Sequence, residues 1–184
     1  MNIFLFNFEW MIPNMALAGL GFLFGILYLN SKHTYLKVPL FVLWFLFLPN
    51  TIYLVTDIQH YFPQILRTDW LGWILLTGQY LFLILFGIFS YFAGMIPIEK
   101  FFRRKKIHHY SWVFLIFNFA IAFAVVLGKI ERTHSWYVFT QPLRVVSDVV
   151  DVLTSPLLMG LVIGFGVFLN LLYFAFRKRL SKLK

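Results

Sequence analysis

The sequence predicts an all-α fold, a polytopic helical membrane bundle with five transmembrane helices and one amphipathic helix at the outer face. Three observations lead to it. First, 61% of the 184 residues are hydrophobic and only 12% are charged, whereas a soluble domain averages about 45–50% apolar and about 25% charged residues. Second, the 24 Phe, 9 Tyr and 6 Trp suit lipid contact and anchoring at the membrane interface. Third, five stretches without a charged residue are long enough to cross a bilayer.

These five stretches define the predicted spans in chain order. A hydrocarbon core about 30 Å thick requires about 20 helical residues, and each stretch has at least 19 residues without Asp, Glu, Lys or Arg. The stretches are Trp10–Ser31, Val38–Thr56, Trp70–Ile98, Ile107–Gly128 and Val152–Phe176. They predict transmembrane helices over residues 11–30, 37–56, 71–96, 110–128 and 155–176.

The segment between the fourth and fifth spans is too short to cross the membrane. Its uncharged part, Thr133–Leu143, has eleven residues and contains Pro142. Beyond it, polar residues recur at helical spacing among valines and leucines, a pattern typical of an amphipathic helix. The polar positions are Arg144, Ser147, Asp148 and Asp151. We therefore expect an amphipathic helix over residues 137–153, starting near Pro142 and lying on, or dipping into, the outer leaflet.

The distribution of Lys and Arg predicts that the N-terminus lies outside and the C-terminus inside. In this orientation the cytoplasmic side receives 12 of the 16 basic residues and the outer side receives 4, as the positive-inside rule requires. The net charge of +9 is then explained by topology and by contact with anionic headgroups, so nucleic-acid binding is not needed. We expect one integral membrane domain over residues 1–184, in the cytoplasmic membrane of the cell and surrounded by the lipid bilayer.

Six of the seven carboxylates fall on the predicted outer side, together with His60 and His134. Acidic residues follow no strong topology rule, so this distribution indicates either a solvated rim of loops or a polar site. Two polar patterns favour a site. One lies at the end of the second span, and the other lies between the fourth and fifth spans.

The first pattern follows Pro49, which removes a backbone donor and releases the carbonyl of Phe45 within the apolar layer. Polar residues then recur at intervals of three, four and three, within an arc of about 80° at about 100° per residue. They are Asn50, Tyr53, Asp57 and His60. This stripe is expected to face the bundle interior or a wet cleft, because polar side chains are costly in lipid. The alternative is a helix end whose polar groups bond one another and the released carbonyl.

Residues of both patterns resemble a known family. The first motif, PN..Y..TD, consists of Pro49, Asn50, Tyr53, Thr56 and Asp57. The second motif, before the last helix, consists of Gly128, Lys129, Arg132, His134, Ser135, Trp136 and Tyr137. With these motifs the sequence resembles the uncharacterised bacterial membrane family catalogued as domain of unknown function 1361. That family has Arg, Asn and Asp where this chain has Lys129, His134 and Tyr137. The resemblance implies a membrane location and no particular chemistry.

Ligand binding fits these residues better than catalysis does. The sequence has no H-E-x-x-H, no G-x-S-x-G, no glycine-rich phosphate loop and no Cys, which argues against the corresponding enzyme classes. Arginine can hold carboxylates or phosphates, aromatic rings can stack on a ligand, and a histidine can ligate the iron of a heme. The expected ligand-binding residues are Asn50, Tyr53, Asp57, His60, Arg132, His134, Trp136 and Arg144, with His60 and His134 as metal ligands.

We therefore expect a ligand-binding or transport subunit for a small amphipathic micronutrient such as heme. In length, and in lacking an ATPase motif, the chain is similar to the substrate-binding subunits of energy-coupling-factor importers, which implies other membrane transport subunits and an ATPase as partners. Two small-residue pairs, Gly21-x-x-x-Gly25 and Gly160-x-x-x-Gly164, fit either bundle packing or docking to such a subunit.

Two alternatives of other classes stay open. One is an intramembrane enzyme that acts on a lipid or a cell-envelope precursor at the outer leaflet, with Asp57 and His60 as acid/base groups or metal ligands. The other is a noncatalytic membrane assembly partner, in which the polar stripe is structural. The effect of conservative changes at the stripe distinguishes these alternatives.

Overall fold

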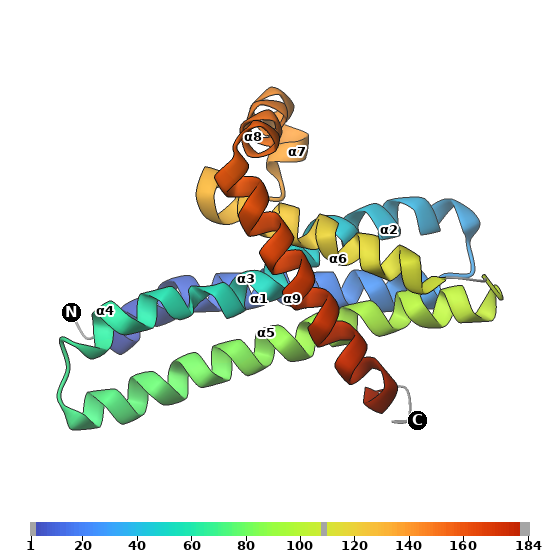
Figure 1. The fold of residues 1–184 in the computed structure, drawn as a ribbon. Coiled ribbons are helices and arrows are strands. Elements are labelled where there is room, and N and C mark those ends of the chain that lie inside the picture. The colour runs from blue at the N-terminus through green and yellow to red at the C-terminus, as the bar shows by residue number, and fades with distance from the viewer. Residues whose placement is uncertain (1–2, 108–109, 181–184) are drawn as a thin grey trace. The chain divides into compact units, whose positions relative to one another are not determined.

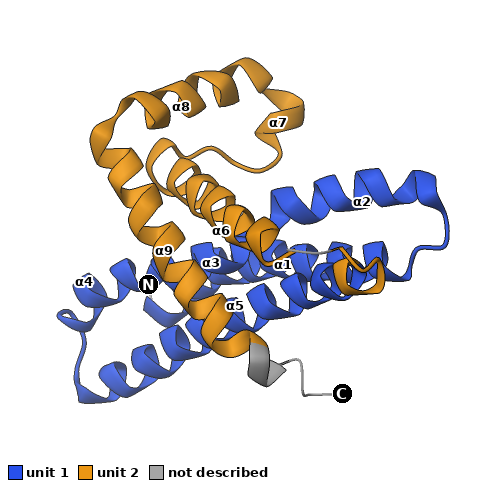
Figure 2. Cartoon of the chain, turned by 45° about the vertical axis from the view of Figure 1, so that its right-hand side comes forward, with its two compact units in different colours: residues 1–101 blue, residues 102–184 orange. Residues whose placement is uncertain are grey.

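The computed structural model describes residues 3–107 and 110–180. Every regular element in these ranges is helical, and five helical segments are long and apolar enough to cross a membrane. The predicted fold class, an all-α polytopic bundle with five spans, is therefore confirmed. The chain forms two compact units, unit 1 over residues 1–101 and unit 2 over residues 102–184 (Figure 2). Each unit is described by itself.

Unit 1 contains the first three spans (Figure 1). Its elements are α1 (Ile3–Asn30), α2 (Thr34–Phe47), α3 (Pro49–Thr56), the 3₁₀ helix η1 (Asp57–His60), α4 (Tyr61–Ile65) and α5 (Trp70–Arg104), whose last turn enters unit 2. The second span runs from Thr34 to Ile65 through α2, α3, η1 and α4, and its regular helical hydrogen bonding is interrupted at Leu48, between α2 and α3. Helix α1 packs against both α2 and α3.

Glycines and one tryptophan bring the helices of unit 1 close together. The indole Nε1 of Trp44 donates a buried hydrogen bond of 2.8 Å to the carbonyl of Gly94 on α5. A Cβ added to Gly25 on α1 would lie 3.0 Å from the same carbonyl oxygen, and one added to Gly21 would lie 3.0 Å from the Cα of Leu48. Gly21 and Gly25 thus serve close packing inside unit 1, which is the first of the two roles expected for this pair.

Backbone carbonyls at the break in the second span accept hydrogen bonds from nearby side chains. Pro49 is the first residue of α3, a position where its missing N–H is least costly. Around it, the Nδ2 of Asn50 donates to the carbonyl of Phe47 at 3.0 Å, and the hydroxyl of Thr51 donates to the carbonyl of Leu48 at 2.7 Å. These bonds keep backbone groups from facing lipid without a partner. Asn50 thus bonds a backbone carbonyl at the helix break, that of Phe47.

Unit 2 contains the last two spans and the predicted amphipathic segment. Its elements are α6 (Tyr110–Val126), the π-helix η2 (Leu127–Glu131), α7 (Tyr137–Thr140), α8 (Pro142–Thr154) and α9 (Pro156–Leu180). Helices α6 and α9 pack together. In their interface the Nδ2 of Asn118 donates to the Oδ1 of Asn170 at 3.0 Å, and the rings of Phe114 and Tyr173 stack at 5.3 Å. In the described part of unit 2, a Cβ at Gly160 or Gly164 would meet no atom within 4 Å.

Helix α8 has the amphipathic pattern that the sequence predicts, and it begins at Pro142. Its most exposed apolar side chain is that of Leu143, at 85%. Val146, Val150 and Leu153 continue this exposed apolar face, whereas Asp148 and Val152 are buried on the opposite side. The helix thus directs the side chain of Asp148 inward and an apolar surface outward. This is the arrangement of a helix that lies in a membrane interface.

A single residue, Ser155, joins α8 to α9. Its backbone is extended (φ −89°, ψ 112°), as the following Pro156 requires. Its N–H donates to the carbonyl of Asp151 at 3.1 Å, and its own carbonyl accepts from the N–H of Met159 at 3.0 Å. The corner is therefore bonded to both helices.

Candidate functional site

The connection between α6 and α9 gathers polar and aromatic side chains into one group, here named the α8 cluster. Its members come from η2, from the loop after it, and from α7 and α8. They are Glu131, Thr133, His134, Trp136, Tyr137, Arg144, Asp148 and Asp151. Three of the residues expected to bind a ligand, His134, Trp136 and Arg144, belong to it.

A π-helical turn places the first members of the cluster. Helix α6 is followed directly by the five residues of the π-helix η2, and π-helical turns are frequent at functional sites. The chain then reverses at Arg132, whose φ of 55° is left-handed, and the backbone N–H groups of Arg132 and Thr133 both bond to the carbonyl of Leu127. This capped turn brings Thr133 against α8. Arg132, the fourth expected residue of this segment, lies exposed at the turn.

Asp148 is the centre of the cluster. Asp148 is only 9% exposed. Its Oδ2 accepts a hydrogen bond from the hydroxyl of Thr133. The Nε of Arg144, one turn earlier on α8, lies 3.8 Å from the same oxygen. A buried carboxylate needs hydrogen-bond and charge partners to be stable. Asp148 thereby ties the turn after η2 to α8.

Aromatic rings extend the cluster away from Asp148. The guanidinium of Arg144 lies over the ring of Tyr137, with 4.8 Å between its Cζ and the ring centroid. The ring of Tyr137 meets that of His134 edge to face at 5.0 Å. His134 in turn stacks flat on Trp136, with 4.5 Å between centroids and 4° between planes. A cation and three rings thus lie in consecutive contact, and both kinds of group can interact with planar or apolar ligands.

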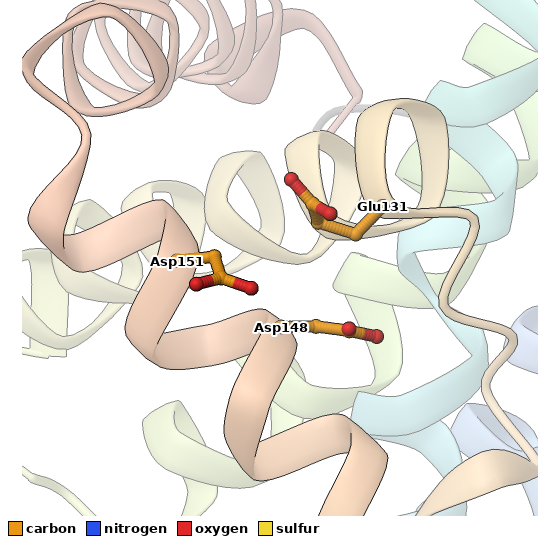
Figure 3. A group of neighbouring side chains, drawn as sticks. All are labelled: Glu131, Asp148 and Asp151. Carbon is orange, nitrogen blue, oxygen red and sulfur yellow. The ribbon is translucent and has the colours of Figure 1, made fainter.

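Three carboxylates of the cluster lie close together (Figure 3). Glu131 comes from η2, and Asp148 and Asp151 come from α8. Their nearest oxygen atoms all lie within 4.8 Å of one another. Carboxylate oxygens are the ligands preferred by hard divalent cations such as Ca²⁺ and Mg²⁺. Within residues 3–107 and 110–180 this is the one group of three such ligands, and neither His60 nor His134 belongs to it.

The other expected residues lie in unit 1, at the end of the second span. Asn50 and Tyr53 are half-buried, Asp57 is only 2% exposed, and His60 is exposed. His60 leaves the stripe because the helix tightens to 3₁₀ geometry after Thr56, which turns each residue by about 120° instead of about 100°. The ring of His60 packs edge-on against Trp10 at 5.7 Å, and its Nε2 lies 3.3 Å from the amide of Gln59.

Unit 1 also contains a group of neutral polar side chains that we call the amide cluster: the buried Asn7 and the half-buried Gln64 and Gln79. The Nδ2 of Asn7 donates to Gln64 at 2.8 Å and to Gln79 at 3.0 Å, and its Oδ1 accepts from Gln64 at 2.9 Å. The carboxylate of Asp57 interacts electrostatically with Tyr80, the residue after Gln79. This cluster was not predicted from the sequence. Three uncharged amides on three separate helices leave no periodic signal in the sequence.

The proximity of the three carboxylates in the α8 cluster was also not predicted from the sequence. Asp148 and Asp151 are three residues apart on one helix, so their common face could be predicted from spacing. Their proximity to Glu131 could not, because it depends on how the π-helical turn folds back on α8. The expected residues thus fall into two sets: His134, Trp136 and Arg144 gather in unit 2 with Arg132 at the adjoining turn, and Asn50, Tyr53, Asp57 and His60 lie in unit 1.

The hydroxyl of Thr133 gives a direct test of the cluster's stability. Replacing Thr133 with valine keeps the side-chain shape and removes the donor to Asp148, so the free energy of unfolding should fall by about 1–3 kcal/mol. The melting temperature of the detergent-solubilised protein measures this. Thr154→Val is the matched control, because that exposed hydroxyl bonds only to carbonyls of its own helix. Equal melting temperatures for the two variants would contradict the role given to Thr133.

Comparisons with known proteins place the chain in a family. Residues 13–172 match the family described as "Protein of unknown function (DUF1361)". The match covers both the span that carries the PN..Y..TD motif and the α8 cluster. No curated protein matches the sequence, and no solved structure matches the fold.

Proposed function

Because the chain belongs to the DUF1361 family, whose function is unknown, we propose a function from its own residues: it is a membrane protein that binds a small amphipathic ligand, as the ligand-binding subunit of a transport system. The observation that carries this proposal is the α8 cluster. In it a cation, three aromatic rings in contact and three carboxylates meet within one short segment. Structural packing alone does not require so many exposed or half-exposed polar groups beside an apolar helix face.

The cluster matches an amphipathic molecule in two ways. Arg132 and Arg144 supply guanidinium groups for a carboxylate or a phosphate, and the rings of His134 and Trp136 supply a flat surface for an apolar ring. The exposed apolar face of α8 lies on the same helix as Arg144. In the orientation predicted from the basic residues, this segment lies at the outer face of the cytoplasmic membrane, where it would capture a ligand arriving from outside.

Heme is one ligand of this class. It combines a planar apolar ring with carboxylates, and its iron takes a histidine nitrogen. His134, in the α8 cluster, is the candidate axial ligand in unit 2, and His60 is a separate candidate in unit 1. Release to the cytoplasm would require other membrane subunits and an ATPase, since the sequence contains no phosphate-binding loop of its own.

Isolation of the full chain from its native membrane tests the proposal. We expect a bound small molecule, detected by the absorbance spectrum and by mass spectrometry of the extracted ligand, or else binding of heme or another amphipathic anion from a metabolite panel. Arg144→Gln should weaken the measured affinity about tenfold, equivalent to about 1.4 kcal/mol, because it removes a charge-assisted contact. Ser147→Ala, at an exposed position on the same helix, should leave the affinity unchanged.

A protein that is free of ligand and binds nothing from the panel would overturn the proposal. So would an affinity that Arg144→Gln leaves unchanged. The enzyme alternative makes a different prediction at the other set of residues. If the chain acts on a lipid or an envelope precursor, Asp57→Asn and His60→Ala abolish turnover without lowering the amount of protein in the membrane.

A further inference from the structure

A lysine at one end of unit 1 lies against two aromatic rings. Lys37 belongs to the first turn of α2, Tyr28 lies near the end of α1, and Phe101 lies in the last turn of α5. We call these three residues the Lys37 cluster. All three lie within unit 1, and they belong to none of the sites described above.

The two rings hold the ammonium group of Lys37 in place. The rings of Tyr28 and Phe101 meet edge to face, with 4.9 Å between their centroids and 69° between their planes. The Nζ of Lys37 lies 5.4 Å from the centroid of Tyr28 and 4.9 Å from that of Phe101. Both distances are within the range of about 6 Å over which a ring attracts a cation. The ammonium is therefore positioned before any ligand arrives.

The Lys37 cluster lies where the hydrocarbon core meets the lipid headgroups. Helix α1 ends at Asn30 and α2 begins at Thr34, so the chain turns back between its first two spans at this end of unit 1. Lys37 lies only about 4–5 Å along α2 from Thr34, at about 1.5 Å per residue. Tyr35, in the same turn, is 72% exposed, and an exposed tyrosine is typical of the membrane interface.

The rings attract the charge of Lys37 but offer no oxygen to its N–H groups. An ammonium group has three donors. In the part of the chain that the structure describes, the ammonium of Lys37 has these ring contacts and no ion pair or hydrogen bond. Lys37 is also half-buried, so its ammonium is in contact with less water than a fully exposed one. An anionic oxygen from outside the protein would satisfy the donors through charge-assisted hydrogen bonds.

We propose that Lys37, positioned by Tyr28 and Phe101, binds the headgroup phosphate of an anionic phospholipid. The occupied leaflet is the one at this end of unit 1, which is the cytoplasmic leaflet in the predicted orientation. Lys32, in the preceding turn, and Lys100, next to Phe101, are exposed, and their charges favour an anionic headgroup over a zwitterionic one. Basic groups between transmembrane helices on the cytoplasmic side bind such headgroups. The site is independent of the ligand proposed for the α8 cluster.

Native mass spectrometry of the full chain, purified and then supplied with defined lipids, tests this site. The wild-type protein should retain phosphatidylglycerol at least about tenfold more than phosphatidylcholine. Lys37→Gln should lower this ratio at least about fivefold, because it removes the positioned charge. Lys32→Gln is the matched control, since it removes the same charge at an exposed position five residues earlier and weakens the topology signal equally. It should lower the ratio less than about twofold.

A third variant tests the role of the rings. Phe101→Leu keeps every charge and removes one ring from the ammonium, so it should lower the ratio by about two- to fivefold. Equal retention of both lipids by the wild type, or equal losses in Lys37→Gln and Lys32→Gln, would overturn the proposal. An unchanged ratio in Phe101→Leu would contradict the positioning by the rings. Displacement of the lipid by millimolar inorganic phosphate would overturn the assignment to a lipid and indicate a free phosphate ion instead.

Discussion

Replacing Asn7 with leucine is expected to lower the free energy of unfolding by about 3 kcal/mol. Asn7 is fully buried, and its side chain makes hydrogen bonds to Gln64 and Gln79 and accepts one from the indole of Trp10 at 3.2 Å. Each buried partner left without a bond costs about 1–3 kcal/mol. The individual bonds are worth less in a membrane, about 0.6 kcal/mol on average, and the loss of several at once sets the size of the effect.

The melting temperature of the protein in detergent measures this effect. For a chain of this size, a loss of about 3 kcal/mol corresponds to about 6–12 °C. Asn14→Leu is the matched control, two turns further along α1 and outside the amide cluster; it should change the melting temperature by much less. If Asn7→Leu melts within about 2 °C of the wild type, a shift worth no more than about 1 kcal/mol, the amide cluster does not hold α1, α4 and α5 together.

Alanine at Gly87 is expected to destabilise the protein by about 2 kcal/mol, although alanine favours helices. Its Cβ would lie 2.6 Å from the backbone oxygen of Thr51 and 3.0 Å from the Cβ of Leu54. Neither atom is the end of a flexible side chain, so α3 would have to move away from α5. Overpacking of this kind costs about 1–3 kcal/mol.

Gly78, on the same helix, provides the control with the opposite sign. An added Cβ there meets no described atom within 4 Å, so Gly78→Ala should raise the free energy of unfolding by up to about 1 kcal/mol through helix propensity. Thermal unfolding of both variants measures the difference. A Gly87→Ala protein as stable as Gly78→Ala would mean that α3 and α5 are not in close contact at this point.

Hydropathy was enough to predict the five spans, because a membrane forces every apolar crossing into a complete helix. Their ends were harder to predict. Helix α1 begins at Ile3 and not near residue 11, because Glu9 is exposed and a solvated charge does not end a helix. The second span continues past residue 56 to Ile65, because η1 and α4 extend it without a break. Charge marks where lipid ends, which is not where the helix ends.

The site was predictable where it depends on neighbours in sequence. The spacing around Trp136 and Arg144 is local, and the structure gathers those residues into the α8 cluster. The stripe of the second span was predicted only in part, since one 3₁₀ turn carries His60 to the surface while Asp57 stays buried. In the amide cluster, Asn7 bonds to Gln64, which lies 57 positions further along the sequence, and to Gln79, which lies 72 positions further along. Such contacts follow only from tertiary packing.

The corner at Ser155 has a mechanical consequence. The residue before a proline has little freedom in ψ, and hydrogen bonds on both sides tie this one to α8 and α9. The connection at Ser155 therefore holds the angle between α8 and α9 fixed and does not act as a hinge. A force that tilts α8 would therefore also tilt α9, because the bend between the two helices does not absorb the movement. Movements at the two ends of α9 are coupled in this way.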